Sequence, residues 1–130
     1  MRLVPIALLM IVSISAWADW TKAAENDEAI YYLEPTTLQK HGPLRRVWVM
    51  HDLKTRDKYG HLSIKFLEEF DCQEERWRYL SASGHSGPTG SGTTLTSASE
   101  TSEWSFAPPD SSARRLLKAV CSGKPIDIRD

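Results

Sequence analysis

The chain carries two cysteines and four histidines, the side chains best suited to redox, metal or nucleophilic chemistry. Cys72 and Cys121 form an even pair, and in an exported protein such a pair predicts a disulfide, here closing a loop of about 50 residues. A metal site or a catalytic thiol is the alternative, but metal sites usually show clustered ligands such as C-x-x-C or H-E-x-x-H. Here the cysteines are isolated and the histidines are scattered, at His41, His51, His61 and His85. We therefore predict a structural disulfide, no metal and no cofactor.

No motif in the sequence assembles a catalytic centre. Ser, His and Asp are present, but no spacing orders a nucleophile beside a base. The glycine-rich segment 83–92 lacks the G-K-[ST] ending of a phosphate-binding loop, and Pro88 stands where a nucleophile elbow needs glycine. Glu68 and Glu69 are neighbours in an expected strand, so their carboxylates point to opposite faces and cannot share a substrate. The sequence therefore predicts a protein that is not an enzyme.

The polar segment 54–60 gathers groups that suit a protein partner. Three cations and an amphipathic ring within one loop fit acidic or mixed-charge protein surfaces. These candidate protein-binding residues are Lys54, Arg56, Lys58 and Tyr59. The glycine-rich segment 83–92 is a second candidate surface, because binding residues sit disproportionately on loops held by a rigid scaffold. For each loop, an ordinary solvated connection is the alternative.

Charge and composition exclude other classes of partner. There are 16 Lys and Arg residues against 17 Asp and Glu, a net charge of -1, so no strong field favours nucleic acid or an anionic membrane. With 41% hydrophobic and 25% charged residues, the composition is that of an ordinary globular chain. We expect one small folded domain.

The first 18 residues have the features of a secretory signal peptide. Arg2 supplies the positive start, residues 3–14 form an apolar run, and Ala16-Trp17-Ala18 matches an A-x-A cleavage site. The run is shorter than the roughly 20 apolar residues of a membrane-spanning helix. No cysteine lies in or just after it, so we expect neither a lipid anchor nor a transmembrane segment in the mature chain. The mature protein is expected to begin at Asp19.

The hydrophobic pattern predicts an antiparallel sheet followed by one helix. Short alternating runs separated by turn residues are typical of hairpin-connected strands. We expect strands at residues 20–24, 29–33, 45–53, 61–72 and 75–83, with a further strand-forming run at 93–96. After two prolines, Asp110 or Ser111 can cap a helix with apolar positions at i, i+3, i+4 and i+7. These positions are Ala113, Leu116, Leu117 and Val120.

The apolar face of this helix must cover the sheet. Cys72 ends a strand on the face that carries the strand's phenylalanines, and Cys121 adjoins the apolar stripe of the helix. Their disulfide would therefore fasten the helix to the sheet. The large rings are expected to pack beneath the helix, and a groove for a small ligand is the alternative. They belong to Trp48, Trp77, Trp104, Phe66 and Phe70.

Six segments, taken in their order along the chain, carry a resemblance to a known family. They are Tyr31-Tyr32-Leu33-Glu34-Pro35, Arg46-Val47-Trp48-Val49-Met50 with Asp52 and Lys54, Phe66 with Glu69-Phe70-Asp71-Cys72, Ser86-Gly87-Pro88 with Gly90-Ser91-Gly92, Trp104, and Val120-Cys121. With them the chain resembles the surface-adhesin protein E family of Gram-negative bacteria. The resemblance implies an α+β fold, a curved antiparallel sheet of about six strands with the C-terminal helix on its concave face, tied by the disulfide.

The resemblance also implies binding rather than catalysis, because the family's named member is an outer-membrane lipoprotein that adheres to host extracellular matrix and serum proteins. We expect a surface-adhesin protein E-like domain at residues 19–121, between the signal peptide and a flexible tail at 122–130. This domain would be an exported protein-binding module, periplasmic or secreted and cell-surface associated. The lipid-bearing cysteine is missing, so the resemblance supports the family's fold for this chain more directly than it supports the family's adhesive function. The alternative is a periplasmic structural or accessory envelope protein without a host ligand.

Overall fold

The computed structural model describes residues 2–5 and 19–124. Within these residues, eight strands form one antiparallel sheet and an α-helix follows, so the fold belongs to the α+β class. The predicted signal peptide, residues 1–18, and the predicted tail, residues 122–130, lie largely outside the described residues. Both stay predictions, as do the domain bounds 19–121.

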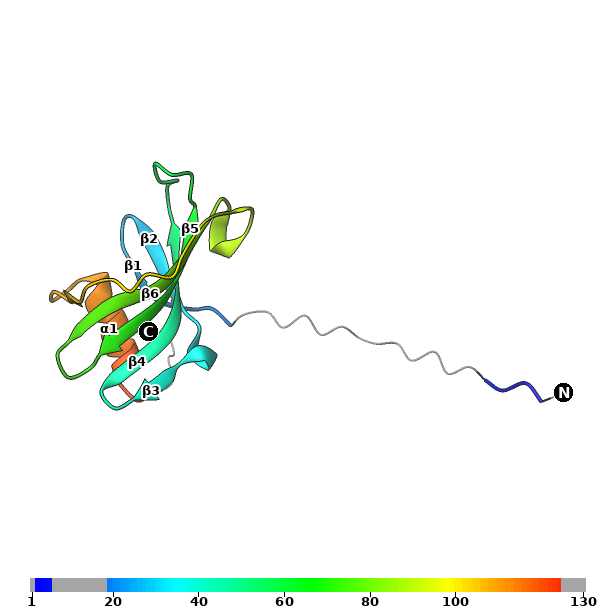
Figure 1. Cartoon of the computed structure of the whole chain (residues 1–130), viewed down its shortest axis with the longest axis horizontal. Coiled ribbons are helices and arrows are strands. Elements are labelled where there is room, and N and C mark those ends of the chain that lie inside the picture. The colour runs from blue at the N-terminus through cyan, green and yellow to red at the C-terminus, as the bar shows by residue number, and fades with distance from the viewer. Residues whose placement is uncertain (1, 6–18, 125–130) are drawn as a thin grey trace.

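Six strands cross the sheet in the order β1-β2-β4-β5-β6-β7, and the short strands β3 and β8 pair with β4 and β6 (Figure 1). The bounds are β1 Thr21–Glu25, β2 Ala29–Leu33, β3 Gln39–His41, β4 Leu44–Leu53, β5 Ser63–Asp71, β6 Arg76–His85, β7 Thr94–Ala98 and β8 Ser105–Phe106. Two 3-10 turns, η1 Pro35–Thr37 and η2 Pro88–Gly90, lie in the connections. The six strands of the main path confirm the predicted hairpin series, and β3 and β8 are additional to it.

Because side chains alternate along a strand, the sheet has two faces of different chemistry. Val47 and Val49 of β4 lie opposite Glu68 and Phe66 of β5, and both valines belong to the core beneath the helix. The intervening side chains of β4 and β5 point the other way, to what we call the outer face. Glu68 and Glu69 therefore point to opposite faces, as predicted.

Helix α1, Ser112–Cys121, packs against the sheet (Figure 1). Ser111 is its N-cap: the Oγ accepts a hydrogen bond from the backbone N–H of Arg114 at 3.1 Å. This bond satisfies one of the open donors of the first turn. The buried helix positions are Leu116, Leu117 and Val120, at the predicted spacing. A serine cap and an apolar stripe thus place the helix as the sequence indicates.

The predicted disulfide between Cys72 and Cys121 is confirmed, and their Cα atoms are 5.7 Å apart. It joins the residue that follows β5 to the last residue of α1. The core along this contact also contains Leu33, Val47, Val49, Phe70 and Ala107. Since the chain has two cysteines and both are bonded, no thiol remains for metal or nucleophilic chemistry.

The prediction that all five large rings pack beneath the helix holds for Phe70, which lies in the core, and for Trp77, which packs against it. Phe66 points to the same face of the sheet but packs against His51 and Tyr79, outside that core. Trp48 points to the outer face, because it alternates with the core-facing valines of β4. Trp104 lies over Arg76 and Arg78, whose guanidinium carbons are 4.4 and 4.2 Å from the ring centroid. Its ring thus covers charged groups rather than the core.

The carboxylate of Glu69 is fully buried on the outer face, between arginines of the two adjacent strands. Arg46 donates from Nε to Oε2 at 2.6 Å, and Arg78 donates from Nε and Nη2 to Oε1 at 2.9 and 2.6 Å. Burial alone would raise the pKa of the Glu69 carboxyl, but the hydrogen bonds from both guanidinium groups hold it below its usual range. This cluster ties β4, β5 and β6 together.

Candidate functional site

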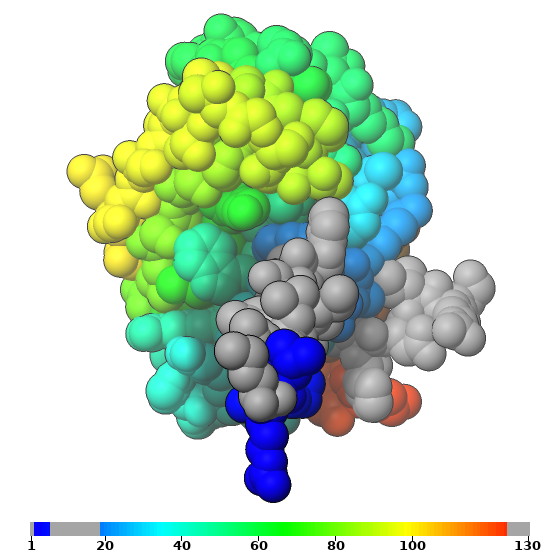
Figure 2. Space-filling view, turned by 90° about the vertical axis from the view of Figure 1, so that its right-hand side faces the viewer, coloured from blue at the N-terminus to red at the C-terminus, as the bar shows by residue number. Residues whose placement is uncertain are grey.

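The two candidate loops lie together at one end of the sheet. Residues 54–60 join β4 to β5, and residues 86–93 join β6 to β7 (Figure 1). Arg56 donates from Nη1 to the backbone oxygen of Ser86 at 2.8 Å, which fastens one loop to the other. Figure 2 shows the atoms of both loops packed against each other at the top of the molecule. We call residues 54–60 together with 86–96 the loop end.

The first loop owes its shape to Asp57. The Asp57 carboxylate accepts hydrogen bonds from the backbone N–H of Tyr59 at 2.9 Å and of His61 at 2.8 Å. Gly60 closes the turn at a φ of 89°, a conformation that glycine adopts without strain. Partial burial alone would raise the pKa of the Asp57 carboxyl, but hydrogen bonds from His61 and Tyr59 hold it below its usual range. The loop is therefore a defined turn that presents fixed side chains.

The four predicted binding residues divide into two pairs. Lys54 forms an ion pair with Glu25, at 2.7 Å between Nζ and Oε2. Arg56 is committed to backbone oxygens, because Nη1 also donates to Gly60 at 2.7 Å. Lys54 and Arg56 therefore form contacts within the protein that stabilise its structure. In contrast, Lys58 and Tyr59 face outward: the tyrosine is 69% exposed, and Lys58 Nζ lies 5.0 Å from the centroid of its ring.

The glycine-rich loop is docked on the sheet. The Oγ of Ser63 donates to the backbone oxygen of Gly87 at 2.7 Å and accepts from the N–H of Gly90 at 2.8 Å. The backbone N–H of Thr89 donates to Asp52 Oδ1 at 2.8 Å. Gly90 has a φ of 77°, a backbone conformation that strains any residue with a side chain. Glycine is therefore favoured at this position of the turn.

An apolar groove of about 410 Å³ opens beside the first loop. Its walls come from the loop and from β5, β6 and β7, on the same side of the sheet as the helix. The lining residues are Asp57, Tyr59, His61, Ile64, Phe66, Ala82, Gly84 and Thr96. Leu95 is also an exposed apolar side chain at this end of the molecule. The loop end therefore combines an exposed cation and aromatic ring with an apolar recess.

His61 connects the loop to β7 at the edge of this groove. Its Nδ1 lies 2.9 Å from Asp57 Oδ2, and its Nε2 lies 2.9 Å from Thr96 Oγ1. A Cβ on residue 84 would overlap the imidazole, so Gly84 is what leaves room for the buried ring. The order carboxylate, imidazole, hydroxyl is that of a catalytic triad. Sequence analysis missed it because Thr96 reaches His61 only through the register of β6 with β7.

Strand β7 ends the main path of the sheet, and among the described residues no strand pairs with its far edge. All five of its residues, Thr94–Ala98, are exposed, and none is charged or a proline. Charges and prolines are the usual features that block an open edge against added strands. The edge adjoins the groove through Thr96, so a partner segment that pairs with β7 would lie next to it.

Fold and surface together define a small, disulfide-braced sheet module that presents two fixed loops and an open strand edge. The model of the family described as surface-adhesin protein E matches residues 20–122, so the chain belongs to that family. A surface-adhesin family implies an exported or cell-surface protein. Within residues 2–5 and 19–124, no helix has the length and apolar character needed to span a membrane.

The chain is also similar in structure to protein E of Haemophilus influenzae. Crystal form II of that protein matches with a TM-score of 0.64 and 10% identity, over 82% of this chain and 89% of that chain. A structure from the non-typeable organism matches with a TM-score of 0.61 and 10% identity, over 84% and 79% of the two chains. At this identity the likeness shows the fold alone. A sequence comparison with curated proteins finds no match.

Proposed function

We propose that the protein is an exported, non-enzymatic binding module that adheres to a protein of the host extracellular matrix or serum. The observation that carries the proposal is the loop end: rigid loops that hold Lys58 and Tyr59 outward, beside an apolar groove and an open strand edge. Membership of the surface-adhesin protein E family supports adhesion as the role. The alternative is a periplasmic accessory protein without a host ligand.

The chemistry of this surface suits a protein partner. Tyrosine is enriched among the residues that contribute most to protein interfaces, because it buries a large ring while its hydroxyl stays able to form a hydrogen bond. Lys58 adds a positive charge that attracts an acidic patch, and such attraction weakens as salt rises. The rigid loop lowers the entropy lost on binding, since Asp57 and Arg56 already fix its backbone.

Replacing Lys58 and Tyr59 together by alanine should weaken binding to the partner at least about tenfold, through loss of a central ring and a charge. Binding would be measured on immobilised matrix and serum proteins, at low and physiological salt. The matched control replaces Lys40 and His41, a cation and a ring that are likewise exposed but lie in β3. Arg56 is left intact, because its loss would release both loops.

The outcomes separate the two functions. If the Lys58 and Tyr59 variant binds as the wild type does, the loop end is not the adhesive surface. If the wild-type protein binds no matrix or serum protein above a reduced, unfolded control, adhesion fails and the periplasmic accessory role is favoured.

The non-enzymatic part of the proposal has its own test, because Asp57, His61 and Thr96 have the order of a triad. In our proposal these groups are structural and anchor the loop to β7. We expect no hydrolysis of activated esters above the rate of free imidazole. Thr96→Val keeps the shape of the side chain and removes its hydroxyl. Hydrolysis by the wild-type protein that Thr96→Val abolishes would contradict the non-enzymatic proposal.

A further inference from the structure

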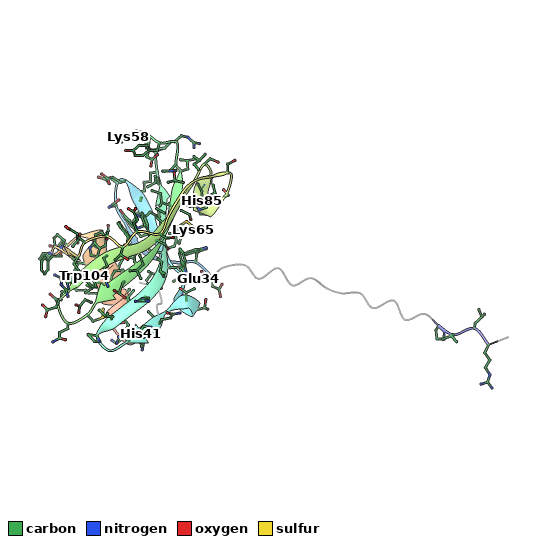
Figure 3. All side chains as sticks on the ribbon, in the orientation of Figure 1. Glu34, His41, Lys58, Lys65, His85 and Trp104 are labelled. Atoms are coloured by element: carbon green, nitrogen blue, oxygen red, sulfur yellow. A yellow bond between two sulfur atoms is a disulfide. The ribbon has the colours of Figure 1, made fainter. Side chains whose placement is uncertain are left out.

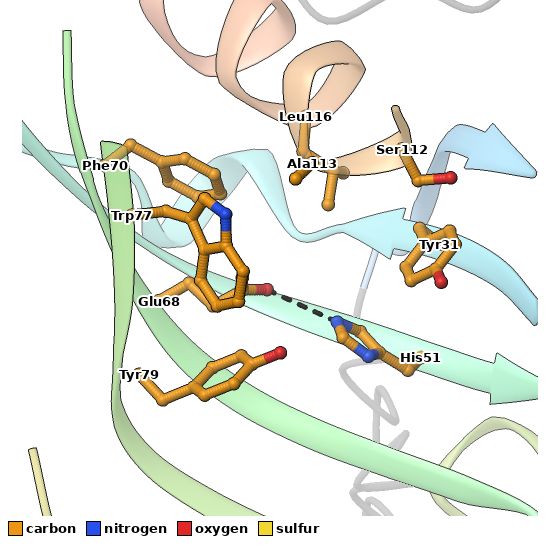
Figure 4. A pocket seen from close by; sticks show the side chains of 9 residues that line it. All are labelled: Tyr31, His51, Glu68, Phe70, Trp77, Tyr79, Ser112, Ala113 and Leu116. Carbon is orange, nitrogen blue, oxygen red and sulfur yellow. Dashed lines mark ion pairs between the residues drawn. The ribbon is translucent and has the colours of Figure 1, made fainter. Parts of the chain in front are cut away.

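A cavity of about 110 Å³ lies between helix α1 and the sheet, away from the loop end (Figure 4). It is lined from β2, β4, β5, β6 and the first turns of the helix. The lining residues are Tyr31, His51, Glu68, Phe70, Trp77, Tyr79, Ser112, Ala113 and Leu116. For scale, an apolar cavity of about 150 Å³ in another protein accepts benzene. This cavity therefore has room for a ligand of about five non-hydrogen atoms.

Three buried polar atoms at this cavity have no hydrogen-bond partner among residues 2–5 and 19–124. They are Glu68 Oε2, His51 Nε2 and Trp77 Nε1. The Glu68 side chain is only 3% exposed, and its Oε2 lies 3.5 Å from His51 Nε2, a contact that is an ion pair only when the imidazole is protonated. Figure 4 shows the carboxylate and the imidazole pointing toward each other across the cavity. An unpartnered buried polar atom costs about 1–3 kcal/mol, so native proteins normally supply such atoms with a partner.

Aromatic rings form most of the cavity wall. Tyr31 meets the His51 ring edge-on at 4.8 Å, and Trp77 meets Tyr79 in the same way at 4.8 Å. Phe66, which lines the groove of the loop end, stacks on Tyr79 at 4.0 Å between ring centroids. The faces of aromatic rings carry negative potential and attract cations.

The charges around the cavity also favour a cation. The nine lining residues include one carboxylate and no lysine or arginine. Burial raises the pKa of the Tyr79 hydroxyl, and the nearby Glu68 carboxylate raises it further, as expected where the potential is negative. The N-terminal turn of α1 brings a partial positive charge to the cavity at Ser112, which offsets only part of the negative charge of the carboxylate.

We propose that this cavity is a binding site for a small alkylammonium ion, with the methyl groups against the aromatic rings and the charge balanced by Glu68. The ligand class follows from the size of the cavity, its rings and its single carboxylate. Tetramethylammonium, with five non-hydrogen atoms, is the simplest probe. The same chemistry is offered by free choline and by a phosphocholine headgroup.

The test is an NMR titration of the full-length mature protein with tetramethylammonium chloride, against sodium chloride at equal ionic strength. The reporter is the indole N–H signal of Trp77, assigned by its loss in Trp77→Phe. We expect this signal to shift and saturate with tetramethylammonium, and not with tert-butanol, a neutral molecule of similar size. Repeating the titration with choline and with phosphocholine shows whether the site takes the free ion or also the headgroup.

Glu68→Gln keeps the shape of the side chain and removes its charge, so it should weaken binding at least about tenfold. Glu100→Gln, which changes an exposed carboxylate outside the cavity, is the matched control and should bind as the wild type does. Should Glu68→Gln fold poorly, Ala113→Leu fills the cavity from the helix side and should abolish binding. A Trp77 signal that responds no more than in sodium chloride, equal binding of tert-butanol, or unchanged binding by Glu68→Gln would overturn the proposal.

Discussion

Cys121→Ser is expected to lower the free energy of unfolding by about 2–5 kcal/mol. The bond joins residues 49 apart in sequence, for which the loss of chain entropy in the unfolded state amounts to about 4 kcal/mol. It also holds the C-terminal end of α1, where Leu117 and Val120 bury their side chains against the sheet. A domain of this size has a modest core, so the change is a large share of its total stability.

Urea denaturation measures this change, and hydrogen exchange locates it. In Cys121→Ser, the amides of residues 112–121 should exchange much faster than those of β4 and β5, because the helix loses its tether while the sheet keeps its hydrogen bonds. Cys72→Ser with Cys121→Ser serves as the control for the free thiol and should behave alike. Loss of less than about 1 kcal/mol, or exchange that rises equally everywhere, would show that the disulfide does not fix the helix.

Replacing Arg46 and Arg78 together by methionine should cost about 3 kcal/mol or more, because the carboxylate of Glu69 is then buried without a partner. Methionine keeps much of the arginine volume over Glu69, which excludes water from it. The arginines are 43% and 27% exposed in the native protein, so the loss comes mainly from Glu69 rather than from them. Adding Glu69→Leu to the double variant should restore most of the stability.

The pH dependence gives a second, independent measurement of the same cluster. In the wild type the pKa of Glu69 is lowered by folding, so its contribution is present above its unfolded pKa and is lost as pH falls through the folded pKa. In the double variant, burial without the arginines raises the pKa of Glu69, so acid protonates this carboxylate and relieves the cost of burying its charge. The difference in free energy of unfolding between the wild type and the double variant should therefore shrink on acidification. A deficit that is the same at neutral and acidic pH, or that Glu69→Leu does not relieve, would contradict this account.

Helix α1 and the disulfide were predictable because their signals are local. A serine cap, four apolar positions at helical spacing and an isolated pair of cysteines can each be recognised without knowing the fold. Strand β3, Gln39–His41, gives no such signal, since its residues are polar and exposed. The strand forms because the turn at Gly42 folds the chain back so that it pairs with β4. Strand β8 is two residues long and is defined only by its pairing with β6.

The candidate site was predictable as a set of loops, but not in its internal arrangement. Sequence placed Lys58 and Tyr59 on a polar loop, where the structure exposes them. It could not show that Arg56 holds the neighbouring loop, because that contact joins residues 30 apart whose proximity depends on strand order. The contact between His61 and Thr96 likewise joins residues far apart in sequence and depends on the pairing of the strands. In contrast, alternation placed Glu68 and Glu69 on opposite faces, but only the fold shows that two arginines enclose the Glu69 carboxylate.

The central claim is that a protein partner binds at the loop end, and site-specific photo-crosslinking tests it most directly. A photoreactive residue replaces Tyr59 in one variant and His41, in β3, in another. Figure 3 shows Lys58, next to the first position, and His41 at opposite ends of the sheet. Both proteins are incubated with the matrix or serum protein that the wild type binds. We predict a crosslinked product from position 59 and none from position 41. A product from position 41 alone, or equal products from both, would contradict binding at the loop end.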